Sequence, residues 1–404
     1  MDGPDIPSFF ICPISLQIMK DPVTLSTGIT YDRESIDRWL FRYKHNTCPV
    51  TKQPLDNHTL TPNSTLLRLI QSWHLLKSSK LILAVDPPRP TFDLSHLHDL
   101  INKVREPESQ IKSLRSIKLL IQENENNRRY VEESGIPSLI ASLVTETSPQ
   151  EISHLNGNST TIEEFMNVLF HLRLSPETLE KIVEDNNGKI IRSLSSILQL
   201  GSFQARIHAA LLLKSIFKVI GENYKMELHS DLFDGIVEIL KDQNSKRATT
   251  ATLSILILVT PFGRNRIRAI EAGIVPVLVE LLAETDERRS CESMLVVLEI
   301  LCGWSDGRSA FVAHPASVAA VSSKILRVSQ LANERAVKVL LLVCRYCMGG
   351  EILKEMVEVG GVTKLCMVVQ GACSRKAKEK AKEILGLHFR TWNKSPCFRS
   401  CLLP

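Results

Sequence analysis

A repeating pattern of apolar helices, each preceded by a small residue, runs through most of this chain and constrains its fold more than any other feature. The small residues that mark the pattern are Gly135, Gly188, Gly235, Gly273, Ala316 and Gly361. They are 53, 47, 38, 43 and 45 residues apart, and we attribute the long first interval to a polar loop inserted over residues 145–161. A drifting period of this size predicts helical units that stack on their neighbours and share one continuous core.

The pattern fills residues 94–392, and no segment within it alternates between apolar and polar residues as a strand would. Its period resembles that of armadillo and HEAT repeats. Arrays of this class present a long concave face, which we expect to come mostly from the helices that follow the marker residues. The sequence therefore predicts an all-α superhelix that holds a protein or a peptide.

A compact module precedes the repeats, over residues 5–79. Two short strands, residues 22–25 and 29–31, meet at a turn in which Gly28 can supply a positive φ. A turn-rich stretch over residues 44–62 follows the first helix of the module.

Both helices of the module have recognisable capping residues. Asp32 suits the N-cap of the first, and Asn63 or Ser64 suits the N-cap of the second. The apolar residues that we expect on their buried faces are Ile36, Leu40 and Tyr43 in the first helix, and Leu66, Leu67, Ile70 and Trp73 in the second. A proline-rich linker over residues 80–93 separates the module from the repeats, and we predict a disordered tail over residues 393–404.

The module contains two Cys-Pro loops, a hairpin and a helix, which is the layout of a RING finger. A RING finger binds two zinc ions, and a structural zinc site takes four Cys or His ligands. Here Cys12 and Cys48 lie 36 positions apart, and the only tight pair is His45 with Cys48. We therefore expect no metal and no cofactor, and two cysteines that are buried as small apolar residues.

Without zinc, hydrogen bonds between polar side chains must hold the two loops in shape, provided that every buried group has a partner. The sequence offers many candidates but does not show which pairs form. The candidates are Asp21, Asp32, Arg33, Glu34, Ser35, Asp37, Arg38, Thr47 and Thr51.

The module as a whole resembles a U-box, the metal-free relative of the RING finger. The resemblance is carried by Cys12, Pro13, Ile14, Asp21, Pro22, Val23, Gly28, Ile29, Thr30, Tyr31, Asp32, Arg33, Ile36, Trp39, Leu40, Cys48, Pro49, Val50, Thr51, Pro62, Asn63, Leu67, Ile70 and Trp73. The rest of the chain resembles the plant ubiquitin ligases in which armadillo repeats follow a U-box. That likeness is carried by Ala336, Val337, Val339, Leu340, Glu355, Met356, Val359, Lys364, Leu365, Gln370, Lys378, Ala381 and Trp392.

The resemblance implies an E3 ubiquitin-protein ligase whose U-box binds a ubiquitin-charged conjugating enzyme. The contact residues it implies are Ile14, Leu16, Trp39 and Pro49. Lys52 stands where the family often has an arginine that positions ubiquitin, and a lysine lacks the planar fork of that group. From spacing alone, Ile14 and Leu16 could equally be core residues, and Lys52 an ordinary surface lysine.

No covalent ubiquitin intermediate is implied, because nothing in the sequence places a basic group beside either cysteine of the module. The repeats would hold the protein substrate, and self-ubiquitination is also expected. The fold class is then mainly α, with a small α+β U-box followed by an all-α armadillo superhelix. The alternatives are an armadillo scaffold with a non-catalytic U-box, and a zinc-binding RING variant.

The composition of the chain limits the partners and the compartment that we expect for the protein. A net charge of +5 on 404 residues does not indicate nucleic-acid binding, and we interpret the basic run over residues 375–382 as a solvated helix face. No apolar segment is long enough to cross a membrane, and ten scattered cysteines favour a reducing compartment. We expect a cytoplasmic protein. The sequence does not decide whether part of it is nuclear or whether it forms a homo-oligomer. By resemblance it regulates plant immune or stress signalling.

Overall fold

The computed structural model of the chain describes residues 7–55, 57–70, 94–152, 159–346 and 350–393, together with Phe398. The chain divides into two compact units, Met1–Arg89 and Pro90–Pro404, which we describe separately. The linker predicted over residues 80–93 lies outside the described residues, as does most of the tail predicted over 393–404. Within that tail, Phe398 is buried, and its ring centre lies 5.6 Å from that of Phe389.

The N-terminal unit is built on a three-stranded antiparallel sheet in the order β2-β1-β3. The strands are β1 (Pro22–Thr24), β2 (Thr30–Asp32) and β3 (Thr61–Pro62). Gly28 has a φ of +79° in the turn between β1 and β2, so the predicted hairpin is present. The third strand was not predicted, because two residues are too few to produce an alternating pattern.

Helix α1 (Arg33–Asp37) follows β2 and continues as a π-helical turn, η2 (Arg38–Arg42). Ile36 and Leu40 are buried as expected, but Tyr43 is 63% exposed, and its predicted burial is wrong. A π-helical turn has more residues than an α-helical one, so the position after it rotates away from the core. A short 3-10 helix, η1 (Ser8–Phe10), precedes the sheet, and residues 64–70 are helical.

The second unit is an array of α-helices, with one short 3-10 helix, η3, between α11 and α12. They are α3 (Leu94–Val104), α4 (Pro107–Glu123), α5 (Glu125–Glu133), α6 (Ile136–Glu146), α7 (Pro149–Ile152), α8 (Ser159–Leu172), α9 (Pro176–Asp185), α10 (Lys189–Leu200), α11 (Phe203–Val219), η3 (Glu222–Lys225), α12 (Ser230–Asp242), α13 (Lys246–Val259), α14 (Gly263–Glu271), α15 (Ile274–Glu284), α16 (Arg288–Cys302), α17 (Ser305–Ala313), α18 (Ser317–Lys324), α19 (Gln330–Tyr346), α20 (Gly350–Glu358), α21 (Gly361–Gln370), α22 (Arg375–Leu387) and α23 (Phe389–Trp392).

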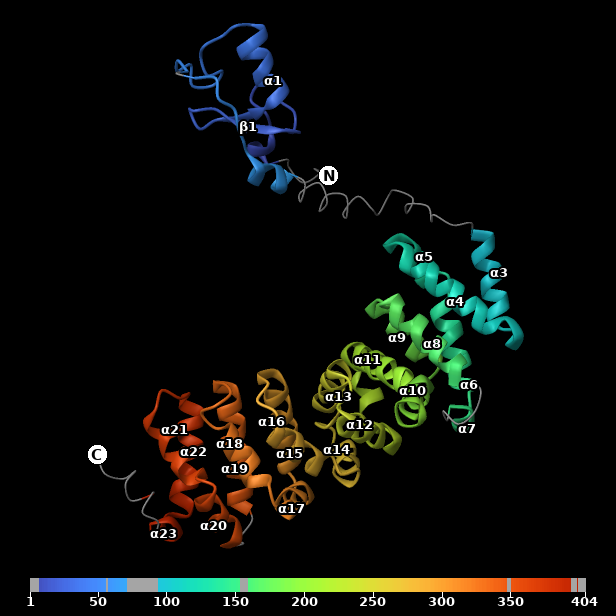
Figure 1. Cartoon of the computed structure of the whole chain (residues 1–404), viewed down its shortest axis with the longest axis vertical. Coiled ribbons are helices and arrows are strands. Elements are labelled where there is room, and N and C mark those ends of the chain that lie inside the picture. The colour runs from blue at the N-terminus through green and yellow to red at the C-terminus, as the bar shows by residue number, and fades with distance from the viewer. Residues whose placement is uncertain are drawn as a thin grey trace. The chain divides into compact units, whose positions relative to one another are not determined.

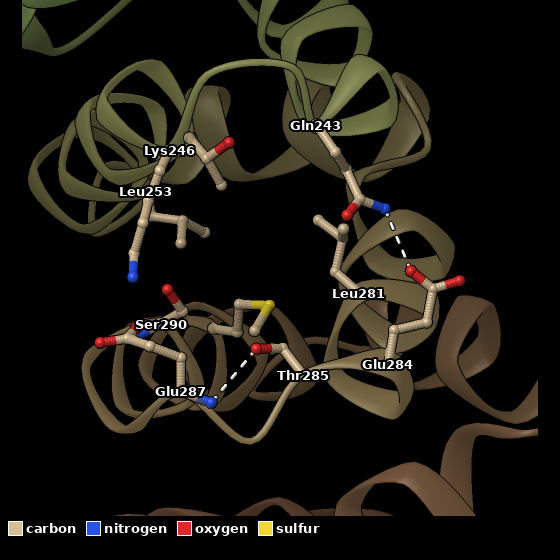
Figure 2. Close-up of a pocket in the computed structure, with 10 residues that line it drawn as sticks. Gln243, Lys246, Leu253, Leu281, Glu284, Thr285, Glu287 and Ser290 are labelled. Carbon is tan, nitrogen blue, oxygen red and sulfur yellow. Dashed lines mark hydrogen bonds between the residues drawn. The ribbon is translucent and has the colours of Figure 1, made fainter.

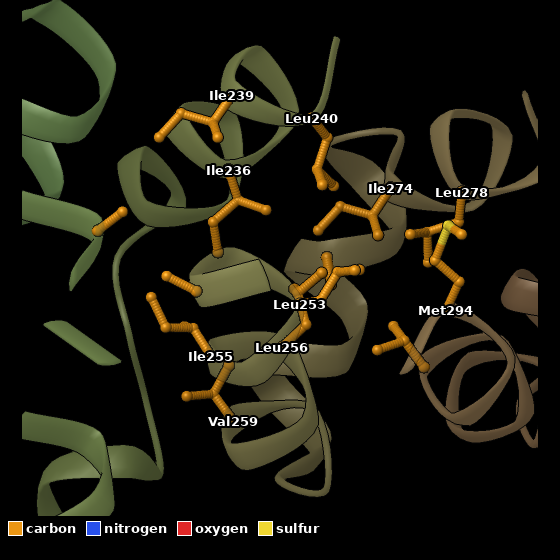
Figure 3. Packing of buried hydrophobic residues seen from close by; sticks show 14 of the residues in the cluster. Ile236, Ile239, Leu240, Leu253, Ile255, Leu256, Val259, Ile274, Leu278 and Met294 are labelled. Carbon is orange, nitrogen blue, oxygen red and sulfur yellow. The ribbon is translucent and has the colours of Figure 1, made fainter. Parts of the chain in front are cut away.

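Thirteen of these helices stack in chain order as two rows (Figure 1). One row consists of the longer helices α4, α8, α11, α13, α16, α19 and α22, and the other of α6, α10, α12, α15, α18 and α21. The rows enclose one continuous apolar core. Figure 3 shows part of it, where Ile236 of α12, Leu253 of α13 and Ile274 of α15 point into the same space. Each fully buried side chain of this size contributes about 1.5–3 kcal/mol.

Most of the marker residues directly precede the second helix of a repeat. Gly135, Gly188 and Gly273 are N-cap residues with φ of +86°, +75° and +83°, a conformation that glycine adopts without strain. The left-handed residue lets one helix end and the next start at a sharp angle within a single position.

Two of the predicted markers are wrong. Gly235 lies inside α12, and the N-cap of that helix is His229. In the last repeat, the N-cap of α21 is Gly360 and not Gly361. With these positions the intervals become 53, 41, 44, 43 and 44 residues, a more regular repeat than the glycines suggested. Gly235 has a different role, because a Cβ there would lie 3.0 Å from the backbone of α10, so α10 and α12 pack closely.

The loop predicted over residues 145–161 is partly helical. Helix α6 extends to Glu146, α7 covers Pro149–Ile152, and α8 begins at Ser159, while residues 153–158 lie outside the described part. Helix α7 packs against α10, and Ile152 is buried. This apolar contact explains why a segment that looks polar in the sequence contains a helical turn. Across the described residues, no helix is both long enough and apolar enough to span a membrane.

Candidate functional site

The N-terminal unit contains two loops with the same backbone structure. In the first, Cys12 N donates to Gln17 O (2.8 Å), and Leu16 N donates to Cys12 O (2.8 Å). A β-bridge between Ile11 and Ile18 closes its base. Leu16 has a φ of +58°, which is uncommon for a residue other than glycine.

The second loop repeats each of these contacts. Cys48 N donates to Gln53 O (2.9 Å), and Lys52 N donates to Cys48 O (2.9 Å). A bridge between Thr47 and Pro54 closes its base, and Lys52 has a φ of +59°. The sequence held a signal for this match, because both six-residue segments begin with Cys-Pro, have a hydroxyl residue fourth and end in glutamine.

Both cysteine sulfurs accept hydrogen bonds where a metal ion could otherwise bind. Asp32 N donates to Cys12 Sγ (3.3 Å). Thr27 Oγ1 donates to Cys48 Sγ (3.4 Å), and the Tyr31 hydroxyl lies 3.1 Å from the same sulfur. Among the described residues, no group of three or more His, Cys, Asp or Glu side chains is arranged to hold a metal ion.

Tyr31 connects the hairpin to the second loop. Its ring is fully buried, and its hydroxyl accepts from Val50 N (3.3 Å) while it contacts Cys48 Sγ. Burial and the bond to Cys48 both raise the pKa of Tyr31. Burial also raises the pKa of the Cys48 thiol, but hydrogen bonds from Thr27, Thr51 and Tyr31 outweigh it and lower that pKa to about 6.

This shift makes the stability of the unit depend on pH. The pKa of Cys48 is lower in the folded protein than the value of about 8.5 for a free thiol, so its stabilising contribution is complete above pH 8.5 and is lost as pH falls toward 6. We expect the urea midpoint of this unit, followed by hydrogen exchange of peptides from residues 8–55, to rise between pH 6 and 8.5. The rise should be smaller in Cys48→Ser. An equal rise in both proteins would show that Cys48 is not the source of the pH dependence.

A second polar group links the first loop to the sheet. Asp32 Oδ1 accepts from Lys20 N (2.7 Å) and Asp21 N (3.0 Å), so its side chain does not cap α1 as predicted. Asp21 in turn accepts from Arg33 Nε (2.5 Å). The carboxylate of Asp32 therefore bonds to backbone groups 11 and 12 positions earlier in the sequence, and not to the first turn of α1.

Asn63 joins the sheet to the second helix. Its Nδ2 lies 3.4 Å from both Thr24 Oγ1 and Thr30 Oγ1, and its Oδ1 accepts from Leu66 N (3.0 Å), as an N-cap should. Of the predicted polar candidates, Glu34 and Arg38 pair only with each other on the surface. Thr27, Tyr31 and Asn63 also belong to the network, although they were not among the predicted candidates.

Asp32→Ala is expected to destabilise the N-terminal unit by about 2–3 kcal/mol, because two backbone N–H groups lose a charged acceptor. Glu34→Ala is the matched control, since it removes an exposed carboxylate from the neighbouring helix and should change stability by less than about 0.5 kcal/mol. Urea denaturation followed by hydrogen exchange of the unit measures both. Equal effects of the two substitutions would show that Asp32 has no special structural role.

The predicted contact residue Trp39 lies half-buried against the second loop. Its Nε1 donates to Thr47 O (2.9 Å), and the His45 ring lies 4.2 Å from it, centre to centre. Lys52 Nζ lies 5.7 Å from the centre of the Trp39 ring, within reach of a cation–π interaction. Pro49 is half-buried in the same loop, so the structure brings Trp39, Pro49 and Lys52 together.

The first loop contributes apolar surface of a different kind. Ile14 is half-buried against the core, whereas Leu16 is 76% exposed at the loop tip. In the second loop, Val50 is 52% exposed at the position that corresponds to Ile14, and the sequence analysis did not select it. A large apolar side chain held in water at a strained backbone position suits a contact with another protein.

Family profiles match both units of the chain. The profile for the U-box domain covers residues 6–79, and that for the plant U-box protein ARM repeat region covers residues 95–403, more than half of the chain. The chain belongs to the plant U-box protein family. Its N-terminal unit is a U-box, and its helical array is an armadillo repeat region, as the sequence predicted.

Full-length relatives share this organisation. The protein is 46% identical to the E3 ubiquitin-protein ligase PUB23 of Arabidopsis thaliana, an alignment that covers 97% of this chain and 95% of the relative. It is 42% identical to PUB22 (97% and 96% covered) and 35% identical to PUB24 (99% and 95% covered), which have the same description in that plant. A solved structure from work on the interaction between cadherin and β-catenin has the same fold, with a TM-score of 0.59 at 13% identity over 82% of this chain and 58% of that one.

The armadillo region of this plant U-box protein contains recesses between successive repeats. One, of about 440 Å³, lies between α12–α13 and α15–α16, so both rows of helices line it (Figure 2). Leu253 and Leu281 form an apolar floor, and Gln243 Nε2 donates to Glu284 Oε2 (3.1 Å) at the rim. A recess of this size can take one side chain of a bound polypeptide.

Proposed function

We propose that this plant U-box protein is an E3 ubiquitin-protein ligase of the RING/U-box type. The names of its Arabidopsis relatives support this activity, and so does the U-box itself. The single observation that carries it furthest is the pair of matched loops, which expose Leu16 and hold Lys52 beside Trp39.

In this proposal the two loops and Trp39 form a shallow groove for a ubiquitin-charged conjugating enzyme. Leu16, Ile14 and Pro49 supply apolar contacts, and Lys52 supplies a cation that positions ubiquitin. The nucleophile is a lysine of the substrate, which attacks the thioester carbonyl and releases the thiol of the conjugating enzyme. The U-box contributes proximity and orientation, which can lower such a barrier substantially.

The armadillo repeats hold the substrate in this proposal, and the ligase also ubiquitinates itself. We further propose that it acts in the cytoplasm, with a nuclear pool, as a regulator of plant immune or stress signalling. Loss of the gene should then change the oxidative burst that a bacterial elicitor provokes, or the response to an abiotic stress. Unchanged responses to elicitor and to stress would contradict the regulatory role but not the ligase activity.

Reconstitution tests the activity directly. Purified full-length protein, activating enzyme, a broad-specificity conjugating enzyme, ubiquitin and ATP should yield ubiquitin chains on the protein itself. Treatment of the protein with a chelator should not reduce the yield once magnesium is restored. Failure with several conjugating enzymes would favour an armadillo scaffold with a non-catalytic U-box, and loss of fold on chelation would favour a zinc-binding variant.

A further inference from the structure

Four successive long helices of the N-terminal repeats carry cations that have no carboxylate partner among the described residues. These cations are Lys118 on α4, Arg173 at the end of α8, Lys214 and Lys218 on α11, and Arg247 on α13. We call these five residues the basic face. Their chains are half-buried or exposed, so their charges meet water or a partner.

The basic face is organised around Phe170. The His208 ring stacks on Phe170 with centres 4.4 Å apart, and the Arg247 guanidinium lies 5.6 Å from the Phe170 centre. Beside Phe170, a recess of about 360 Å³ opens between α8, α9 and α11. Its lining includes the cations Arg173, Lys214 and Lys218 and the apolar residues Leu169, Leu174, Leu179, Leu211 and Leu212.

The electrostatics of buried neighbours show that positive charge dominates here. Burial lowers the pKa of Lys214, and the charge of Lys218 lowers it further. Burial lowers the pKa of His208 to about 4, with smaller effects in the same direction from His171, Lys118 and Arg247. No carboxylate is among the causes of either shift.

Several cations on the equivalent helices of the C-terminal repeats pair with a carboxylate of a neighbouring helix. Arg335 Nη1 of α19 lies 2.7 Å from Glu299 Oε2, and Arg345 of the same helix pairs with Glu383. Lys380 of α22 lies 3.6 Å from Glu334. Pairing of this kind neutralises those cations, whereas the five cations of the basic face have no such pair among the described residues.

We propose that the basic face binds an acidic segment of a protein substrate, with one apolar side chain of that segment in the recess beside Phe170. The proposal rests on the proposed ligase function and adds the chemistry of the substrate. Carboxylates of the segment pair with Lys218 and Arg247, and the leucine-lined recess takes the apolar side chain. A nucleic acid fits less well, because His208 and Arg247 already contact Phe170 and the remaining wall is aliphatic, with no open aromatic surface for bases.

A peptide-binding assay with the full-length protein tests this. The probe is a fluorescein-labelled peptide of glutamates around one phenylalanine, measured by fluorescence anisotropy. Lys218→Glu/Arg247→Glu is expected to weaken binding about tenfold or more and to remove most of its salt dependence. Lys376→Glu/Lys382→Glu, which makes the same charge change at exposed positions of α22, should weaken binding less than about twofold.

Three further measurements separate the possible failures. Circular dichroism should be the same for both variants, because all four positions are exposed. Self-ubiquitination by the unaltered protein reports the ligase function separately, so absent activity with intact peptide binding would contradict the ligase function alone. Equal weakening by the two variants, no binding by the unaltered protein, or tighter binding of a single-stranded oligonucleotide than of the peptide would each overturn the inference.

Discussion

Leu16→Asn is expected to reduce self-ubiquitination about thirtyfold without lowering the unfolding temperature. Leu16 is 76% exposed, so its removal costs the folded protein little, whereas loss of a central apolar contact typically costs a complex about 2 kcal/mol. Asparagine tolerates the φ of +58° better than most residues, which keeps the loop in place. Initial rates with a saturating concentration of charged conjugating enzyme should recover part of the activity, because the defect lies in binding.

Leu326→Asn is the matched control for this experiment. Leu326 is also an exposed leucine with a positive φ (+62°, 44% exposed), but it lies in the armadillo region. The same chemical change there should leave self-ubiquitination unaltered. If both substitutions reduce activity equally, or if Leu16→Asn has no effect, the first loop is not the contact that we propose.

Gly307→Ala is expected to destabilise the armadillo region by about 3 kcal/mol or more. A Cβ at Gly307 in α17 would lie 2.0 Å from Leu301 O and 2.6 Å from Leu301 C in α16. Both are backbone atoms, so no side chain can rotate away and the two helices must separate. The packing of α16, α17 and α18 would loosen together, which urea denaturation followed by circular dichroism should detect as a lower midpoint.

Gly263→Ala shows whether the effect comes from the clash or from the loss of a glycine. Gly263 is the first residue of α14, and nothing lies within 4 Å of a Cβ built there. Alanine should be neutral or should stabilise the helix by about 0.5–1 kcal/mol. Similar losses at both positions would mean that the close approach at Gly307 is not a real constraint.

Much of the architecture could be predicted because its signals are local. The hairpin needed only a glycine between two short apolar segments, and the repeats needed only apolar residues at helical spacing after Gly135, Gly188 and Gly273. A left-handed residue between helices is a property of one position in the backbone, so the sequence shows it directly. The family resemblance depended on the same local features.

The candidate site was less predictable, because its residues meet across the sequence. Leu16 and Ile14 have the same apolar character, and only the loop conformation exposes one and half-buries the other. Asp32 has the sequence context of a helix cap, but the folded chain offers it two N–H groups 11 and 12 positions away. Gly235 likewise resembles the other markers until α10 is seen to pack against it.

The sequence by itself therefore determined a small module with two Cys-Pro loops, followed along the chain by a stack of helices. Local helix and turn preferences were enough for that. Only the tertiary structure decided which distant side chains hold the second loop, because Thr27 and Tyr31 reach Cys48 from the hairpin. It also decided which cations are paired, because Arg115 reaches Glu164 and Arg335 reaches Glu299, whereas Lys218 and Arg247 have no carboxylate partner among the described residues. Pairing between charges depends on distances between helices that lie about one repeat apart, and sequence periodicity does not specify those distances.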